Sequence, residues 1–326
     1  MGAKNGKIAV IGAGASACFF SHLLRDTGYE ITIFEKSRGI GGRCSVRRTE
    51  EFGAFNLGAQ FFTNKNKTLA PYFEEIDKKG LIKELTGPVG YLNHEGNSEP
   101  ANQQKRFIGT PSMNSFLKYW SSSANLALCT KVTSIAYSSN QWTLTSDLGS
   151  SYGGFDACVL TVPQPQGLEL WNQHSQIKVP ATEMFPCIAL MIASSPVPLS
   201  CPHGFIKHPM LSWFSSKQSK EHDQLRTWMV HANPEWSSTH FDADENWIIE
   251  QMTEQLFSLL KVSPKILFSK IHRWRYASSK SISQGDFLWD PHKNLGYIGD
   301  WLRGGRVEGA MESAASLASL LTKTDL

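Results

Sequence analysis

The chain has 326 residues, of which 41% are hydrophobic and 19% charged, and its mean hydropathy is −0.27. This composition is typical of a globular protein with one large domain or two intertwined ones. The net charge of +3 and the pI near 8.4 are too mild to indicate a nucleic-acid partner. No apolar run approaches the roughly 18 residues of a membrane span, so we also expect no membrane partner.

The cysteines and the first residues bear on the cellular compartment. The six cysteines are scattered without a C-x-x-C pair, as in reduced proteins of the cytosol. The opening residues, MGAKNGKIAVIG, run directly into an apolar segment and leave no room for a signal peptide. No His, Cys and Asp residues have the spacing of metal ligands, so we expect a cytoplasmic protein without a metal.

The most informative stretch lies between Lys7 and Arg43. A short apolar run, Ile8–Ile11, has the composition of a buried parallel strand. It is followed by GAGASA, which fits the pattern G-x-G-x-x-G/A. There the first glycine permits a tight turn, the second lets the backbone approach a pyrophosphate, and a small third residue lets helix and strand pack. The residues that we expect at the pyrophosphate are Gly12, Gly14, Ala15, Ser16 and Ala17.

A second apolar run, Ile31–Phe34, ends in an acid, Glu35, which lies 23 residues after Gly12. A carboxylate at this position accepts hydrogen bonds from ribose hydroxyls. A glycine pattern alone is weak evidence, because it also occurs in ordinary turns. Strand, glycine turn, helix, second strand and terminal acid together predict a dinucleotide-binding unit.

A basic, glycine-rich loop, KSRGIGGR, follows Glu35 directly. This arrangement resembles the flavoprotein amine oxidase superfamily, in which the loop and its arginine lie along the FAD pyrophosphate. The resemblance implies that Lys36, Arg38, Gly42 and Arg43 contact FAD.

The segment N-L-G-A-Q-F-F-T, residues 56–63, is similar to a loop of renalase-type flavoproteins that lies over the flavin ring. The resemblance implies a close backbone approach at Gly58, with Ala59, Gln60 and Phe61 beside the isoalloxazine. Asn56 stands where such proteins often have Asp, which removes a charge but keeps the glycine geometry.

Three segments in the middle of the chain extend this resemblance. Residues 126–145 contain two strand signals split by Ser139-Asn140, and Val132 falls where related flavoproteins hold adenine with their backbone. Residues 155–163 form a buried strand ended by Pro163, which we expect near the ligand. Apolar spacing predicts an amphipathic helix over Leu69–Lys83, which we expect to cap the active site.

The C-terminal segment again resembles FAD enzymes of the two-dinucleotide-binding class. Residues 295–301 predict a strand ending in Gly299-Asp300, followed by RGGRVEGA and a helix of small and apolar residues. The resemblance implies that Asp300 accepts hydrogen bonds from ribityl or phosphate-side hydroxyls. It also implies that the start of the helix, at Val307, Glu308 and Ala310, points at the flavin C2 carbonyl.

Residues 164–270 have a different pattern, with β-rich segments separated by Pro and Ser clusters. We expect residues 187–193, 204–207, 210–214 and 225–232 to form strands of one sheet, and residues 246–260 to form a helix capped by Asp244. Several polar residues of this region either face a pocket or are ordinary surface and core residues: His203, Lys207, His208, Trp213 and His231.

The segment HRWRYA, residues 272–277, resembles a segment of bacterial renalase-like proteins. Strand alternation places Trp274 on one face and Arg273 and Arg275 on the other. Trp274 either faces the flavin or is a core tryptophan. Our candidates for catalytic residues are Trp274, His272 and Gln60.

The resemblance implies an α/β (α+β) fold, with a Rossmann-like FAD-binding domain and a discontinuous substrate domain of mixed sheet and helices, in an amine oxidase-like topology. We assign residues 1–65, 105–163 and 271–326 to the FAD-binding domain. Residues 66–104 and 164–270 then form the substrate-binding domain.

In renalase-like proteins the activity is oxidation of misreduced 2- and 6-dihydro NAD(P), with hydride passing to flavin N5 and O2 forming H2O2. The expected partners are thus a small-molecule substrate and O2. The last cysteine is Cys201, well before the C-terminal Gly-Asp, so we expect noncovalent FAD. No residue clearly matches the lysine that amine oxidases place near N5; Lys207 and Lys270 are candidates. Two alternatives stay open: an oxidase or desaturase of a small amine, and a flavoprotein with structural FAD.

Overall fold

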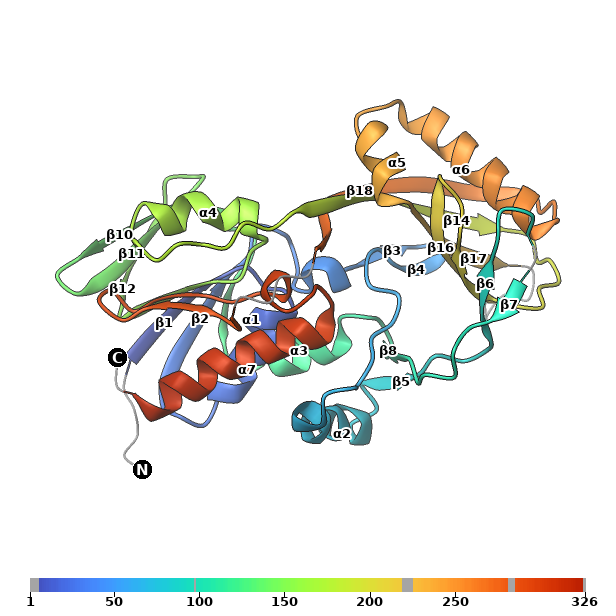
Figure 1. The fold of residues 1–326 in the computed structure, drawn as a ribbon. Coiled ribbons are helices and arrows are strands. Elements are labelled where there is room, and N and C mark those ends of the chain that lie inside the picture. Colours follow the sequence, from blue (N-terminus) through green and yellow to red (C-terminus); the bar gives the residue numbers. More distant parts are fainter. Residues whose placement is uncertain (1–5, 97, 219–224, 281–284, 325–326) are drawn as a thin grey trace.

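The structure is a computed structural model that describes residues 6–96, 98–218, 225–280 and 285–324. Two large sheets, one of six strands and one of seven, organise it (Figure 1). The six-stranded sheet takes its strands from residues 6–160 and 288–297, and the seven-stranded sheet comes mostly from the middle of the chain. The predicted α/β fold is confirmed.

The six-stranded sheet has the order β19-β20-β13-β1-β2-β9. Its strands are β1 (Gly6–Ile11), β2 (Tyr29–Phe34), β9 (Asn125–Ala127), β13 (Ala157–Leu160), β20 (Leu295–Tyr297) and β19 (Leu288–Asp290). All neighbours are parallel except β19 and β20. The central strand β1 is buried on both faces, which explains its continuous apolar run.

The two faces of β1 belong to different layers. Ile8 and Val10 pack against α1 (Ala15–Leu24), α3 (Ser115–Trp120) and α7 (Val307–Lys323). Ala9 and Ile11 pack against β10 (Val132–Ser138), β11 (Gln141–Ser146), β12 (Ser151–Phe155) and α4 (Gln164–Asn172). In Figure 1 the helices α1, α3 and α7 lie below the sheet, and β10–β12 with α4 lie above it.

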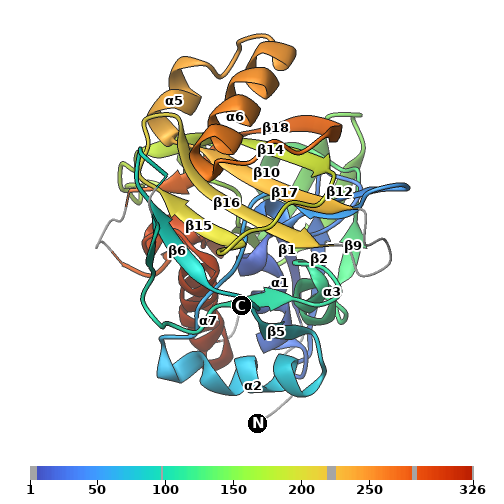
Figure 2. The same cartoon turned by 90° about the vertical axis from the view of Figure 1, so that its right-hand side faces the viewer.

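The seven-stranded sheet has the order β18-β14-β17-β16-β15-β6-β7. Its strands are β18 (Ile266–Ser279), β14 (Met184–Ser194), β17 (Arg226–Ala232), β16 (Leu211–Gln218), β15 (His203–Ile206), β6 (Val89–Leu92) and β7 (Ser98–Pro100). Figure 2 shows α5 (Pro234–Thr239) and α6 (Glu245–Leu260) above this sheet, with β1 and β2 on its other side. Asp244 caps α6 by accepting from the Trp247 backbone N–H at 3.0 Å, as predicted.

The remaining elements join the two sheets. They are the pairs β3 (Val46–Thr49) with β4 (Gly53–Asn56) and β5 (Ile82–Glu84) with β8 (Phe107–Gly109), the short helices η1 (Gly42–Cys44), η2 (Lys67–Leu69) and η3 (Asp300–Leu302), and α2 (Ala70–Lys78).

The helix that we expected over the active site, α2, lies elsewhere. Its apolar side joins the core formed by α1, α3 and α7. Glu75 on α2 bonds to His22 of α1 at 2.9 Å and accepts from the Tyr119 hydroxyl of α3 at 2.6 Å. The expectation that α2 caps the site is therefore wrong.

The predicted domain boundaries stay a prediction, and β18 runs through the one at residues 270 and 271. Within the described ranges, no helix is both long and apolar enough to cross a bilayer.

Candidate active site

The turn after β1 has the geometry that the glycine pattern requires. Gly12 has a φ of +103°, and a Cβ atom there would lie 2.7 Å from the Thr161 hydroxyl oxygen, so only glycine fits. At Gly14 an added Cβ would meet nothing within 4 Å. A Cβ on Gly42 would lie 3.3 Å from the Gly14 Cα, so the two glycine loops are in contact. They form a backbone surface with open space over Gly14.

Glu35 is fixed at the end of β2. Its carboxylate accepts from the backbone N–H of Ala13 at 2.9 Å and from that of Ser37 at 2.8 Å, and the residue is only 8% exposed. Backbone bonds from Thr130 to Glu35 and from Cys129 to Ser37 bring the chain that leads to Val132 beside this acid. The position suits a carboxylate that receives ribose hydroxyls, with adenine next to it.

Arg43 and Asp300 connect the N-terminal loops to the C-terminal segment. The Arg43 guanidinium bonds to the two Asp300 oxygens at 2.9 and 2.5 Å, and donates to the Ala277 carbonyl at 3.2 Å. Burial alone would lower the pKa of Arg43, but the Asp300 carboxylate outweighs this effect and raises it. Two residues that were both expected at FAD are thus in direct contact.

Two helices start at this place. Neither α1 nor α7 has a side-chain cap within the described ranges, so their first N–H groups are available to a ligand. Arg306, just before α7, has a φ of +128° and ψ of 163°, a conformation that costs about 1–3 kcal/mol and is concentrated at functional sites. Open space over Gly14, two uncapped helix starts and the fixed acid Glu35 together fit a dinucleotide with a pyrophosphate.

The other residues predicted to bind the cofactor differ in exposure and in hydrogen-bond partners. Lys36 and Arg38 are exposed. The Pro163 carbonyl accepts from the Tyr297 hydroxyl at 3.1 Å, two residues after Thr161. Gly299 donates its N–H to the Ser313 hydroxyl, while Val307 and Ala310 are buried in the first turn of α7.

Glu308 has a role that the sequence did not indicate. Its carboxylate accepts from the Thr63 hydroxyl at 2.8 Å, from the Asn66 backbone at 2.6 Å and from the Lys65 backbone. It therefore holds the segment after the 58–61 loop on the first turn of α7.

The loop at residues 58–61 is held tightly against Arg43. A Cβ on Gly58 would overlap the Arg43 carbonyl oxygen, and Ala59 donates its N–H to the same oxygen at 2.8 Å. The Gln60 side chain turns back and donates to the carbonyls of Asn56 and Gly58, at 2.6 and 2.9 Å. The loop conformation is therefore set by its own backbone and by the FAD-side loop.

The seven-stranded sheet presents a row of aligned side chains toward this loop. Cross-strand partners share a face of a sheet, and the registers align six positions on six neighbouring strands. The row consists of His272, Ala189, His231, Trp213, Phe205 and Tyr91. Phe61 of the loop contacts two of its members, with ring centres 5.3 Å from Trp213 and 6.1 Å from Phe205. The opposite face of the sheet packs against α6.

Trp274 lies on the side of β18 that faces the loop, opposite Arg273 and Arg275 as strand alternation predicts. Its indole N–H donates to the Leu57 carbonyl at 3.1 Å, and its ring lies 4.3 Å from that of His272. Arg273 donates to the Ala243 carbonyl and Arg275 lies over Phe241, both on the helical side. Trp274 thus supports the loop directly, while Lys270 of the same strand is exposed.

The structure distinguishes the histidines of residues 164–270 that have structural partners from the one that lies in the aligned row. His203 bonds to the Ser215 hydroxyl and the Thr86 carbonyl, and the His208 ring accepts from the Met210 N–H, so both have structural partners. His231 lies in the aligned row, where burial lowers its pKa to about 4 and the Leu57 carbonyl opposes this only in part. Its Nε2 atom has no hydrogen-bond partner among the described residues.

The sequence did not indicate that Tyr91, Phe205 and Arg106 lie near the site. Tyr91 and Phe205 come from short strands whose pairing joins residues 89–92 to residues 203–206. Their alternation with buried neighbours was a usable signal, but no local pattern shows which strands become neighbours.

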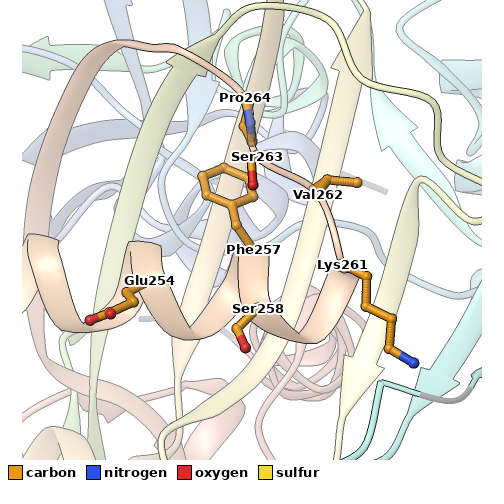
Figure 3. A pocket seen from close by; sticks show the side chains of 7 residues that line it. All are labelled: Glu254, Phe257, Ser258, Lys261, Val262, Ser263 and Pro264. Atoms are coloured by element: carbon orange, nitrogen blue, oxygen red, sulfur yellow. The ribbon is translucent and has the colours of Figure 1, made fainter.

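A hollow at the end of α6 has no connection with this site. It has a volume of about 380 Å³ and is lined by Glu254, Phe257, Ser258, Lys261, Val262, Ser263 and Pro264 (Figure 3). It lies at the helix-covered side of the seven-stranded sheet, opposite the aligned row. In the described part of the chain, no three His, Cys, Asp or Glu side chains are grouped as metal ligands.

Comparisons with known proteins agree with this geometry. Residues 10–76 match the model of the NAD(P)-binding Rossmann-like domain. The renalase of Mus musculus is 26% identical over 353 aligned positions, which cover 97% of this chain and 99% of that protein. The L-amino acid oxidase of Bothrops pictus is 30% identical over 84 residues, which are 23% of this chain and 17% of the oxidase.

A solved structure from Exiguobacterium, described as a protoporphyrinogen oxidase, superposes with a TM-score of 0.77 at 10% identity and covers 99% of this chain and all of that one. This likeness shows that the two chains share a fold. The predicted resemblance to renalase-like proteins of the flavin-containing amine oxidase superfamily is confirmed, and the chain is a flavin oxidoreductase.

Proposed function

We propose that this chain binds FAD noncovalently and oxidises misreduced 2- or 6-dihydro NAD(P), with O2 as the final acceptor. When bound, FAD supplies the N5 atom that receives the hydride and the reduced ring that O2 reoxidises to give H2O2. The protein supplies binding, orientation and a water-poor surface. The full-length similarity to renalase and the local similarity to L-amino acid oxidases support this reading.

The observation that carries the proposal is the aligned row facing the 58–61 loop. Its aromatic members offer flat surfaces of the size of a nicotinamide ring. A dihydropyridine that loses hydride becomes an aromatic pyridinium, so the reaction needs no general base. The buried imidazole of the row, His231, has a pKa of about 4 and is a poor proton acceptor at neutral pH.

Several residues would position the two reactants. Gly58 and Ala59, fixed on the Arg43 carbonyl, form the backbone next to the flavin ring. Trp274 holds that loop through Leu57, and Phe61 connects it with Trp213 and Phe205. His272 packs edge-on against Trp274 and fixes the orientation of its indole.

The cysteines support noncovalent FAD. Cys44 is next to Arg43 in the FAD-side loop, but burial raises the pKa of its thiol to about 12, so it stays protonated. Cys201 donates to the carbonyls of Pro88 and His203. All six cysteines are free, which also supports a reducing, cytoplasmic location.

The test is anaerobic mixing of the purified holoprotein with 6-dihydro-NAD, ordinary NADH and a panel of small amines, followed by flavin absorbance. Fast bleaching by the dihydro isomer alone is expected, with H2O2 released on admission of air. Bleaching by an amine alone would assign the protein to the amine oxidases. Bleaching by no donor would leave FAD as a structural group.

A further inference from the structure

The aligned row ends at Tyr91 and Phe205, and two cationic side chains lie at this end. The Arg106 guanidinium carbon is 5.4 Å from the Phe61 ring centre and 5.8 Å from that of Phe205. The Lys207 ammonium is 5.8 Å from the Tyr91 ring centre. The Tyr91 and Phe205 rings are stacked 5.2 Å apart, so the two cations lie on one continuous aromatic surface.

Arg106 is only 8% exposed and has no carboxylate partner among the described residues. Its NH1 group donates to the carbonyls of Asn102 and Gln104, at 3.2 and 3.1 Å, and its NH2 group to the Asn102 side-chain oxygen at 2.8 Å. All of these acceptors are neutral. A buried charge without a countercharge is costly, and the aromatic faces offset this cost only partly. An arginine in this state is well suited to receive an anion.

Lys207 strengthens the positive charge at this place. It is exposed, and no ion pair within 4.0 Å involves it in the described ranges. The acid that shares this end of the sheet is Glu99, the cross-strand partner of Tyr91. No ion pair joins Glu99 to either cation within those ranges, so the positive charges are not neutralised locally.

We propose that Arg106 and Lys207 form the binding site for the phosphate groups of the dinucleotide substrate. This inference rests on the proposed function, because the reacting ring has to lie at the 58–61 loop. Phe61 follows the 58–60 backbone and contacts both Trp213 of the aligned row and Arg106, so the phosphates of a nucleotide whose ring lies at the loop would follow directly beyond Phe61. Two cations match the two negative charges of a pyrophosphate, whereas they repel a protonated amine.

The first experiment compares two donors on the holoprotein by anaerobic stopped flow: 6-dihydro-NAD and the phosphate-free 6-dihydronicotinamide riboside. For Lys207→Met we expect the Kd of the dinucleotide to rise about tenfold, with the reduction rate at saturation unchanged and the riboside unaffected. Arg106→Met is expected to give a larger loss for the dinucleotide only. Lys105→Met is the matched control, because Lys105 is the exposed neighbour that pairs with Glu84 at 3.8 Å.

The second experiment does not need turnover. Inorganic pyrophosphate is titrated into the same holoproteins by calorimetry, and we expect binding to the wild type and to Lys105→Met, and at least tenfold weaker binding to Lys207→Met. If Arg106→Met does not fold, the result for Lys207→Met still tests the phosphate site. Glu99→Gln is expected to tighten pyrophosphate binding two- to threefold.

The outcomes separate the two proposals. Equal effects of Lys207→Met on both donors, or no binding of pyrophosphate to the wild type, would overturn the phosphate site. If pyrophosphate binding depends on Lys207 but no dihydronicotinamide bleaches the flavin, the phosphate site holds and the proposed reaction fails.

Discussion

The guanidinium of Arg43 and the carboxylate of Asp300 form a two-point ion pair across 257 residues of sequence. One partner belongs to the loop that follows β2 and the other begins η3, just before α7. The pair therefore fixes the distance between the two segments between which the resemblance places FAD.

Asp300→Asn tests the strength of this connection. The Arg43 side chain is 29% exposed, and losing the charge-assisted bonds to its countercharge costs about 2 kcal/mol, so we expect a loss of this order in the free energy of unfolding of the FAD-free protein. Urea unfolding followed by tryptophan fluorescence measures it. Glu84→Gln breaks an exposed ion pair and should cost less than about 1 kcal/mol. Equal losses in the two variants would show that the Arg43–Asp300 pair has no special role.

Two glycines of the first loop should behave differently. Gly14→Ala has open space and an ordinary φ, so the FAD-free protein should change by less than about 1 kcal/mol, while FAD binding weakens because the added methyl occupies the ligand's side. Gly12→Ala, with φ at +103° and Thr161 in the way, should destabilise the FAD-free protein as well. FAD titration and urea unfolding of both variants check this. Unchanged FAD affinity in Gly14→Ala would place the cofactor elsewhere.

The buried imidazole of His231 makes stability depend on pH. Its pKa is about 4 in the folded protein and 6.5 in the free side chain. Between these values the unfolded chain binds a proton that the folded protein does not, so stability falls as the pH drops from 6.5 to 4 and is unaffected by this group above 6.5. His231→Asn should recover roughly 3 kcal/mol of this loss at pH 4. Unfolding curves at pH 4.5, 5.5 and 7.0 measure it, with His292→Asn as an exposed control; parallel pH profiles would contradict the assignment.

Glu308→Gln should loosen the segment at residues 63–66. The amide loses charge-assisted bonds to Thr63, Lys65 and Asn66, and we expect a cost of about 2 kcal/mol. Limited trypsin digestion is the readout, because Lys65 and Lys67 lie in or next to this segment. Cleavage there should become several times faster than in wild type and in the exposed control Glu254→Gln. Unchanged cleavage would show that the Glu308 contacts do not hold the segment.

The sequence predicted those parts of the fold whose cause is local. The hairpin between β10 and β11 turns at Ser139 and Asn140, which both have positive φ, and Asp244 caps α6 as its position indicated. The glycine turn and Glu35 were also predictable from local sequence, because the strand, the turn and the acid lie within 30 residues of one another.

The errors and omissions concern long-range contacts. The apolar stripe of α2 indicated that this side of the helix is buried, but it did not indicate whether α1 and α3 or a ligand packs against it. Nothing in the polar sequence of residues 93–104 indicates that residues 98–100 form β7 at the edge of the seven-stranded sheet. The partners of Glu308 are more than 240 residues away, and no pattern around Glu308 indicates them.

The order of strands in the six-stranded sheet has a consequence for synthesis on the ribosome. Strands β1, β2, β9 and β13 are all made before residue 161, but β20, which completes their parallel pairing, starts at Leu295. At 5–20 residues per second, β20 is translated roughly 7–27 s after β13. During that time the nascent chain exposes the open edge of β13 and the faces of α1 that α7 later covers. The part of the cofactor surface that Asp300 and the start of α7 contribute is thus among the last features to form.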